Sequence, residues 1–270
     1  MPGRFAAGAA FVAVMMAAQA MAQDPVRLYA AGSLKAALTE IAASFQREHG
    51  IAVAGTFGPS GLLRDRIAKG ENAEVFASAN MTHPQSLAKA GRAGEVHAFA
   101  RNQLCALTGP NVDVTSETLL ERMLDPRIRL GTSTPQADPS GDYAWQLFRK
   151  AETLRPGSFK ALDAKAMKLT GGPASPPPPK DRTVYGMIVE KGEADIFLTY
   201  CTNAVLARKE VPSLKVVSVP DALAVGAEYG LTVVNGARPE AGRFAAYIRS
   251  PMGRMILVRH GFGLPPAPRK

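Results

Sequence analysis

Residues 26–45 read VRLYAAGSLKAALTEIAASF, and this stretch decides the fold. Residues 26–30 form a short apolar run typical of a buried strand, and Gly32-Ser33 follows as a tight turn. Four apolar residues then recur at helical spacing, namely Leu34, Leu38, Ile41 and Phe45. The order of strand, tight turn and helix predicts a βα unit at the start of the folded chain.

The same unit recurs directly downstream. Residues 51–57 are a β-rich run, Gly58-Pro59-Ser60-Gly61 form a turn, and residues 62–69 show a helical pattern that ends at Gly70. Residues 74–78 supply a further strand. Repeated βα units predict an α/β fold with mostly parallel sheets flanked by helices.

Two apolar runs, residues 103–108 and 229–234, change this pattern. Between them the βα order starts again, with strands at 127–132 and 195–200, a polar loop at 134–141, and helices at 142–151 and 184–191. We therefore expect two lobes, the second inserted into the first, with two extended crossover segments as the hinge. The expected boundaries are 23–105 for the first part of lobe 1, 106–228 for lobe 2, and 229–270 for the return crossover and the rest of lobe 1.

The first 22 residues have the features of a secretory signal peptide. Arg4 precedes an apolar stretch at 5–18, which closes on Ala20-Met21-Ala22. A transmembrane helix is the alternative, but it needs about 20 apolar residues and usually basic flanks. We expect cleavage after Ala22 and, because no Cys follows, a mature protein that is free in the periplasm.

The charge and the cysteines limit the partners. The chain has a formal net charge of +9, which attracts anions, but its Lys and Arg are scattered and lack the aromatic interleaving of a nucleic-acid binder. We therefore expect no nucleic-acid partner. Cys105 and Cys201 are the two cysteines, and they are either a disulfide or two buried free thiols.

Enzyme signatures are absent from the sequence. It contains no Walker phosphate loop, Gly-x-Gly-x-x-Gly, Gly-x-Ser-x-Gly or His-Glu-x-x-His. The four histidines lack metal-ligand spacing, and we interpret each as a surface or cap residue: His49, His83, His97 and His260. We therefore predict a protein that is not an enzyme and has no cofactor and no cation site.

Ser33, Ser60 and Ser140 each stand where a predicted strand gives way to a predicted helix. A helix N-terminus exposes unpaired N–H groups with partial positive charge, so several of them can hold a dianion without a cationic side chain. Helix capping is the alternative role of each Ser. The repetition of the feature in a two-lobed exported chain favours an anion-binding role.

Motifs along the chain resemble those of a known family. In the first half they are AAGSL at 30–34, FGPSG at 57–61 and AEVFASA at 73–79; in the second half they are DPSGDYA at 138–144, GEAD at 192–195 followed by Tyr200 and Ala204, and RHGFG at 259–263. In this order they resemble the periplasmic molybdate-binding proteins of ABC importers. The resemblance spans nearly all of the mature chain.

The resemblance implies a two-lobed type II periplasmic binding protein fold that holds a tetrahedral oxyanion, molybdate or tungstate, between its lobes. The implied ligand-binding residues are Ser33 and Ser60 from lobe 1, and Ser140, Arg182 and Tyr200 from lobe 2. For Ser140 and Arg182 the family contact is a backbone N–H. An ABC permease of the inner membrane is the implied partner, and we expect the binding protein to be a monomer.

Some residues depart from the family pattern. Asp138 and Asp142 place carboxylates near an expected anion site, where they either point away as helix-start residues or serve a larger coordination shell, as in a related tungstate-binding branch. Thr199, however, stands where that branch has its second acid. The Pro-rich loop within 170–180 is either a surface loop at the mouth of the cleft or a spacer with no role.

Three other functions compete with oxyanion capture. The first is a binding protein of the same fold for another oxyanion, a cation or a small organic acid. The second is an enzyme on this fold, since fold does not fix function. The third, a ligand-sensing regulator, needs a DNA-binding segment where the predicted signal peptide stands.

Overall fold

The computed structural model describes residues 24–177 and 181–265. The predicted signal peptide and residues 178–180 of the Pro-rich loop lie outside the described residues. The strands are β1 (Val26–Ala31), β2 (Val53–Gly58), β3 (Val75–Ser78), β4 (His97–Thr108), β5 (Leu130–Ser133), β6 (Met167–Thr170), β7 (Ile196–Tyr200), β8 (Lys215–Ser218) and β9 (Gly226–Val233).

The helices alternate with these strands along most of the chain. They are η1 (Gly32–Leu34), α1 (Lys35–His49), α2 (Ser60–Ala68), α3 (Thr82–Lys89), α4 (Leu119–Leu124), α5 (Pro139–Leu154), α6 (Ser158–Lys165), α7 (Val184–Glu190), α8 (Cys201–Glu210), α9 (Pro239–Arg249) and α10 (Pro251–Arg259). Within the described ranges, none of them has the length and apolar character that crossing a membrane requires.

The strands form one curled sheet with the order β2-β1-β3-β9-β4-β7-β5-β6, and β8 pairs with β4. Strand β1 is parallel to β2 and β3, and strand β5 is parallel to β6 and β7. Each antiparallel pair includes β4 or β9. The α/β fold with mostly parallel sheets and flanking helices is therefore confirmed.

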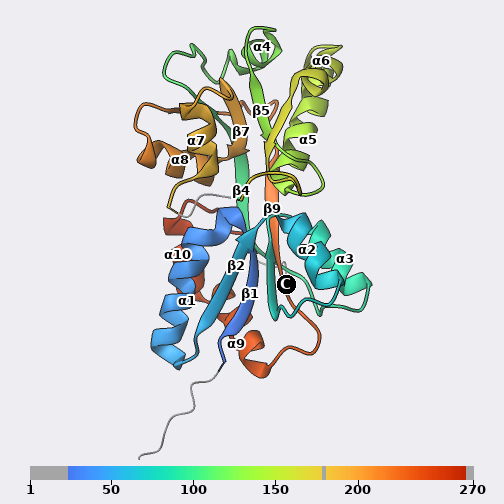
Figure 1. Ribbon diagram of the computed structural model, residues 1–270, viewed down its shortest axis with the longest axis vertical. Helices are drawn as coiled ribbons and strands as arrows, with labels where there is room; N and C mark the ends of the chain where they lie inside the picture. The colour runs from blue at the N-terminus through green and yellow to red at the C-terminus, as the bar shows by residue number, and fades with distance from the viewer. Residues whose placement is uncertain (1–23, 178–180, 266–270) are drawn as a thin grey trace, which may run out of the picture.

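Strand β4 belongs to both halves of the sheet. Its first part pairs with β9 as far as Gln103, and its second part pairs with β7 and β8 from Leu104 onward. Figure 1 shows β4 and β9 running between a half that contains β1 to β3 and a half that contains β5 to β8. We call the first half lobe 1 and the second half lobe 2; the exact boundaries given above stay a prediction.

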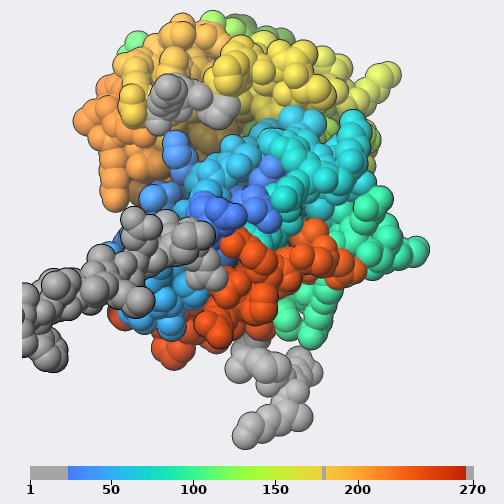
Figure 2. All heavy atoms as spheres, turned by 60° about the horizontal axis from the view of Figure 1, so that its bottom comes forward, coloured from blue at the N-terminus to red at the C-terminus, as the bar shows by residue number. Residues whose placement is uncertain are grey.

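The two lobes are in direct contact. Figure 2 shows lobe 2, in yellow and orange, meeting the blue and cyan part of lobe 1 along a shallow hollow. One continuous hydrophobic core extends through the junction, because it joins Leu34 and Phe99 of lobe 1 to Leu198 and Tyr200 of lobe 2. The site described below lies where this core meets the ends of the strands.

The first βα unit forms as the sequence predicts. Strand β1 is almost fully buried, and Leu34, Leu38, Ile41 and Phe45 all face the core. Helix α1 ends because Gly50 takes a left-handed conformation with φ of 70°, which costs glycine little. The strand, turn and helix predicted from residues 26–45 are confirmed.

Two predicted helix starts are wrong by a few residues. Helix α2 begins at Ser60 rather than at residue 62, and α5 begins at Pro139 rather than at residue 142. The physical reason at α5 is that Pro is favoured in the first turn of a helix, where its missing N–H costs nothing. Both Ser60 and Ser140 are therefore first-turn helical residues rather than loop residues.

A disulfide joins Cys105 of β4 to Cys201 at the first residue of α8. Of the two alternatives that the sequence leaves open, the structure has the disulfide rather than two free thiols. It attaches the crossover strand to the residue that follows Tyr200. The disulfide thus anchors the end of β7 beside the junction between the lobes.

Candidate functional site

Ser33 lies in η1, directly after β1 ends. Its Oγ is 3.0 Å from the hydroxyl oxygen of Tyr229, a fully buried residue of β9. The Tyr229 oxygen also accepts a hydrogen bond of 3.3 Å from the side-chain amide of Asn102 on β4. The turn after the first strand is therefore connected by side-chain hydrogen bonds to both crossover strands.

Ser60 is the first residue of α2 and is almost fully buried. Its Oγ accepts a hydrogen bond of 3.1 Å from the backbone N–H of Ala79, which follows β3. A hydroxyl that accepts this bond keeps its own proton for another acceptor. Ser60 is thus positioned as a donor at the ends of β2 and β3, the two parallel strands on either side of β1.

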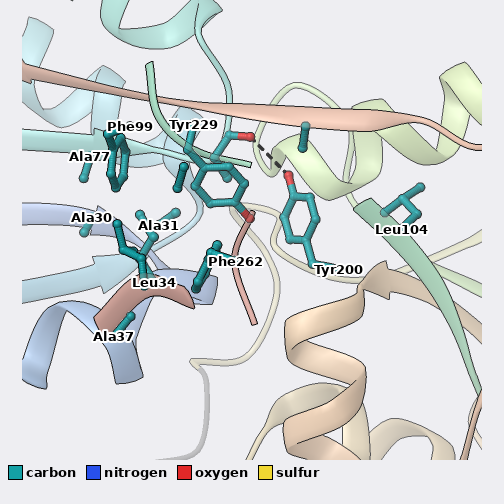
Figure 3. Close-up of a cluster of buried hydrophobic side chains, with 14 of the residues drawn as sticks. Ala30, Ala31, Leu34, Ala37, Ala77, Phe99, Leu104, Tyr200, Tyr229 and Phe262 are labelled. Carbon is teal, nitrogen blue, oxygen red and sulfur yellow. Dashed lines mark hydrogen bonds between the residues drawn. The ribbon is translucent and has the colours of Figure 1, made fainter. Parts of the chain in front are cut away.

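Tyr200 is the last residue of β7 and comes from lobe 2. Its hydroxyl donates a hydrogen bond of 3.3 Å to the carbonyl oxygen of Ala79 in lobe 1, drawn as the dashed line in Figure 3. Its ring centroid lies 5.6 Å from that of Tyr229 and 6.2 Å from that of Tyr143. Ser33, Ser60 and Tyr200 are therefore brought together through Tyr229 and Ala79.

Ser140 lies on the lobe 2 side, in the first turn of α5. Its hydroxyl donates to the Ser133 hydroxyl at 2.8 Å, and its backbone N–H donates to a carboxylate oxygen of Asp138 at 3.0 Å. The N–H expected to face a ligand is thus engaged by the N-cap residue of its own helix. Asp138 places a carboxylate where a helix N-terminus attracts an anion.

The side chain of Arg182 lies apart from the hydroxyl groups of Ser33, Ser60 and Tyr200. Its guanidinium forms an exposed ion pair with Glu190 at 2.6 Å. Among the described residues, no hydrogen bond joins it to Ser33, Ser60, Ser140 or Tyr200. A role for the Arg182 side chain in the site thus has no support here, and its backbone N–H stays a prediction.

Asp142 has a local structural role. Its carboxylate accepts a hydrogen bond of 2.8 Å from the backbone N–H of Gln136. Gln136 has a φ of 68°, which is uncommon for a residue other than glycine, so this bond stabilises the loop before α5. The interpretation of Asp138 and Asp142 as helix-start residues is supported, but the Asp138 carboxyl contacts the buried residues Ser133 and Ser140 rather than pointing outward.

The charge state of the site follows from burial. Burial raises the pKa of Tyr143 to about 12 and holds the pKa values of Tyr200 and Tyr229 well above their usual range, so these hydroxyls keep their protons at neutral pH. Burial also raises the pKa of Asp138 to about 6, although the hydrogen bond from the Ser140 backbone N–H lowers it in part. The site therefore contains neutral hydroxyl groups beside one carboxyl that titrates near neutral pH.

Sequence reasoning missed Tyr229, Asn102 and Ser133 as members of this group. Tyr229 begins one of the two apolar runs that were interpreted only as crossovers. The available signal was a polar aromatic residue within a hinge strand, since a buried Tyr needs a hydrogen-bond partner. Asn102 and Ser133 have no comparable local signal.

Two lobes share one sheet, and hydroxyl groups gather at their junction. This is the architecture of the class of two-lobed solute-binding proteins. The chain belongs to the family described as bacterial extracellular solute-binding protein, which matches residues 26–263. It is 37% identical over 207 residues to an uncharacterized protein of Pasteurella multocida, covering 76% of this chain and 86% of that protein. It is 27% identical over 266 residues to the molybdate-binding protein ModA of Escherichia coli, covering 95% of both.

Solved structures show the same fold. The periplasmic molybdate-binding protein of Azotobacter vinelandii superposes with a TM-score of 0.72 at 19% identity, covering 89% of this chain and 100% of that chain. The sulfate-binding protein SubI of Mycobacterium tuberculosis superposes with a TM-score of 0.73 at 16% identity, covering 90% and 87%. The type II periplasmic binding protein fold is therefore confirmed, and proteins of this fold differ in the ligand that they bind.

Proposed function

We propose that this protein captures a tetrahedral oxyanion, molybdate or tungstate, in the periplasm and delivers it as a monomer to an ABC permease of the inner membrane. The observation that carries the proposal is the meeting of Ser33, Ser60 and Tyr200 around Tyr229 and Ala79. Two strand-to-helix turns of lobe 1 face a buried tyrosine of lobe 2. Similarity to molybdate-binding relatives supports the same ligand.

The chemistry of the donors suits an anion that carries no proton. Ser60 accepts from the Ala79 N–H and still has its own proton to donate, and the acceptor that an anion would replace at Tyr200 is a neutral carbonyl, that of Ala79. Hydrogen bonds to a charged acceptor contribute more than those to neutral ones. Molybdate and tungstate differ from sulfate in their longer metal–oxygen bonds, so the spacing of the donors sets the selectivity.

Closure of the lobes is the mechanical step. Tyr200 donates to Ala79, and the backbone N–H of Gly61 in α2 donates to the carbonyl oxygen of Ala137 in lobe 2 at 2.8 Å. These contacts cross the junction, so this conformation has its lobes together. We propose that anion binding shifts an open pair of lobes toward this arrangement about β4 and β9, and that the permease recognises the closed form.

Asp138 favours a second candidate ligand. An oxyanion that carries a proton, such as hydrogen phosphate, needs an acceptor in its site, and the Asp138 carboxylate beside Ser140 supplies one. This candidate belongs to the same class of binding protein. It differs from molybdate in needing a charged Asp138.

A thermal-shift screen of the mature protein against molybdate, tungstate, sulfate and hydrogen phosphate tests both candidates. Binding to the folded state alone stabilises it by about 2.7 kcal/mol at a hundredfold excess over Kd, which raises the Tm clearly. We expect molybdate and tungstate to raise the Tm much more than sulfate at equal concentration. A response to hydrogen phosphate alone supports the second candidate, and no response to any oxyanion contradicts the proposal.

A further inference from the structure

A chain of three hydrogen-bonding side chains runs from a crossover strand to the candidate site. The Asn102 amide nitrogen on β4 is 3.3 Å from the Tyr229 hydroxyl on β9, which is 3.0 Å from the Ser33 hydroxyl in η1. Asn102 and Tyr229 are buried, and Ser33 is partly exposed at the site end. The direction of the bonds in this chain decides whether Ser33 donates or accepts toward a ligand.

The orientation of the Asn102 amide is fixed by its other contacts. Its oxygen accepts a hydrogen bond of 2.9 Å from the backbone N–H of Gln103, a group that can only donate. Its nitrogen also donates to the Thr202 hydroxyl at 2.8 Å. A flipped amide would place a donor against the Gln103 N–H, so the NH2 group faces Tyr229.

The remaining bonds follow from this orientation. The Tyr229 oxygen accepts from Asn102, and the phenol keeps its proton because burial holds its pKa well above the usual range. That proton is therefore donated to the Ser33 oxygen, the hydroxyl partner 3.0 Å away. Ser33 then accepts from Tyr229, and its own proton is free to point toward an acceptor in the site.

We propose that Asn102 is a positioning residue that fixes Ser33 as a hydrogen-bond donor and thereby selects fully deprotonated oxyanions over oxyanions that carry a proton. The inference rests on the proposed function, because it needs Ser33 to contact the bound anion. Asn102 itself acts three hydrogen bonds away from the ligand, through Tyr229 and Ser33. Its amide is the group that sets the direction of the hydrogen bonds from Asn102 through Tyr229 to Ser33.

A double-mutant cycle measures whether Asn102 acts through Ser33. By calorimetric titration with molybdate, we expect Asn102→Ala to weaken binding roughly five- to tenfold in the wild-type background, because Ser33 loses its fixed orientation. In a Ser33→Ala background the same change should alter affinity less than about twofold. In a Ser60→Ala background, Asn102→Ala should again weaken molybdate binding roughly five- to tenfold. Asn235→Ala, which removes one side-chain bond to Gly91 outside the site, is the matched control.

Asn102→Asp tests the direction of these hydrogen bonds with a change that keeps the shape of the side chain. One carboxylate oxygen still accepts from Gln103, and the other now accepts from Tyr229, so Tyr229 accepts from Ser33 and Ser33 turns its lone pairs toward the ligand. At about pH 8 molybdate and hydrogen phosphate are both dianions, so repulsion by the new charge cancels in the ratio of their affinities. We expect the preference for molybdate over phosphate to fall roughly tenfold or more.

The outcomes separate the two proposals. If the wild type binds no oxyanion, the proposed function fails. If it binds molybdate and Ser33→Ala weakens binding, but the loss from Asn102→Ala is the same with Ser33 present or absent, the positioning role is wrong. An unchanged molybdate-to-phosphate ratio in Asn102→Asp also overturns it, even if Asn102→Ala fails to fold.

Discussion

At the scale of single residues, the candidate site consists of hydroxyl groups whose role can be separated from helix capping. We expect Ser33→Ala, Ser60→Ala and Tyr200→Phe each to weaken oxyanion binding roughly ten- to a hundredfold, because a hydrogen bond to a charged group contributes about 1.5 to 3 kcal/mol. Calorimetric titration measures this loss. Tyr200→Phe keeps the ring packing against Tyr229 and removes only the donor.

Capping predicts the reverse pattern for the two serines. Loss of a cap costs about 1 kcal/mol of unfolding free energy and leaves anion affinity unchanged. Ser250→Ala is the matched control, because its hydroxyl accepts from the Gly253 N–H as a helix cap outside the site. Unchanged affinity in all three site variants would place the anion elsewhere.

Asp138 should make the stability of the protein depend on pH. Its pKa rises from 3.8 in the unfolded chain to about 6 in the fold, so the folded state binds the proton more tightly. The stability that Asp138 contributes is therefore present below about pH 4 and is lost as the pH rises through about 6, by about 3 kcal/mol at about 1.4 kcal/mol per pKa unit. Asp138→Asn keeps an acceptor for Ser140 and removes the titration.

Urea unfolding from pH 4 to pH 7.5 measures the effect. The unfolding free energy of Asp138→Asn should rise relative to that of the wild type as the pH rises. Asp113→Asn, at a fully exposed carboxylate, should follow the wild type. Parallel profiles for wild type and Asp138→Asn would show that this carboxyl is not perturbed.

At the scale of elements, the start of α2 limits how closely the lobes approach. A Cβ on Gly61 would contact the Gln136 carbonyl oxygen and lie 2.8 Å from that of Ala137, so Gly61→Ala cannot adopt this closed arrangement. We expect it to weaken oxyanion binding more than tenfold while the unfolding free energy falls little, since Ala favours a helix. Small-angle scattering should show no ligand-induced compaction in this variant.

Gly242→Ala in α9 is the matched control, because a Cβ there meets no atom within 4 Å. It should bind and compact as the wild type does. Normal compaction of Gly61→Ala with ligand would show that the bond from Gly61 to Ala137 plays no part in the ligand-bound state.

The elements also show what the sequence can predict. Strands β1, β3 and β7 were predicted to within one residue because each is an almost fully buried apolar run. Helix α8 was missed because its buried positions are few and include Asn203, so its apolar periodicity is weak. Strand β4 was predicted too short because its first residues are only partly buried, and its pairing with β9 spans more than a hundred residues.

The residues of the candidate site divide in the same way, into those that a local pattern predicts and those that only the pairing of distant strands brings together. Ser33 and Ser60 are visible in the sequence because a turn between strand and helix is a local pattern. Tyr229 and Asn102 are not, because they reach Ser33 only when two crossover strands pair. Tertiary pairing, rather than local propensity, supplies this part of the site.

At the scale of the whole molecule, the proposed function needs two lobes that close on a dianion, and the net charge of +9 attracts anions over a distance. Membership of the solute-binding family agrees with capture and delivery rather than with chemical change. The disulfide between Cys105 and Cys201 links a crossover strand to the segment that carries Tyr200. The central claim is that this junction holds the anion.

The most direct test is an anomalous difference map from a crystal of the mature protein grown with tungstate, because tungsten scatters strongly and marks its own position. We predict one tungsten peak per chain at the junction of the lobes, within hydrogen-bonding reach of the Ser33, Ser60 and Tyr200 hydroxyls through the tungstate oxygens. A peak elsewhere, or no peak at a tungstate concentration that saturates binding, would contradict the account.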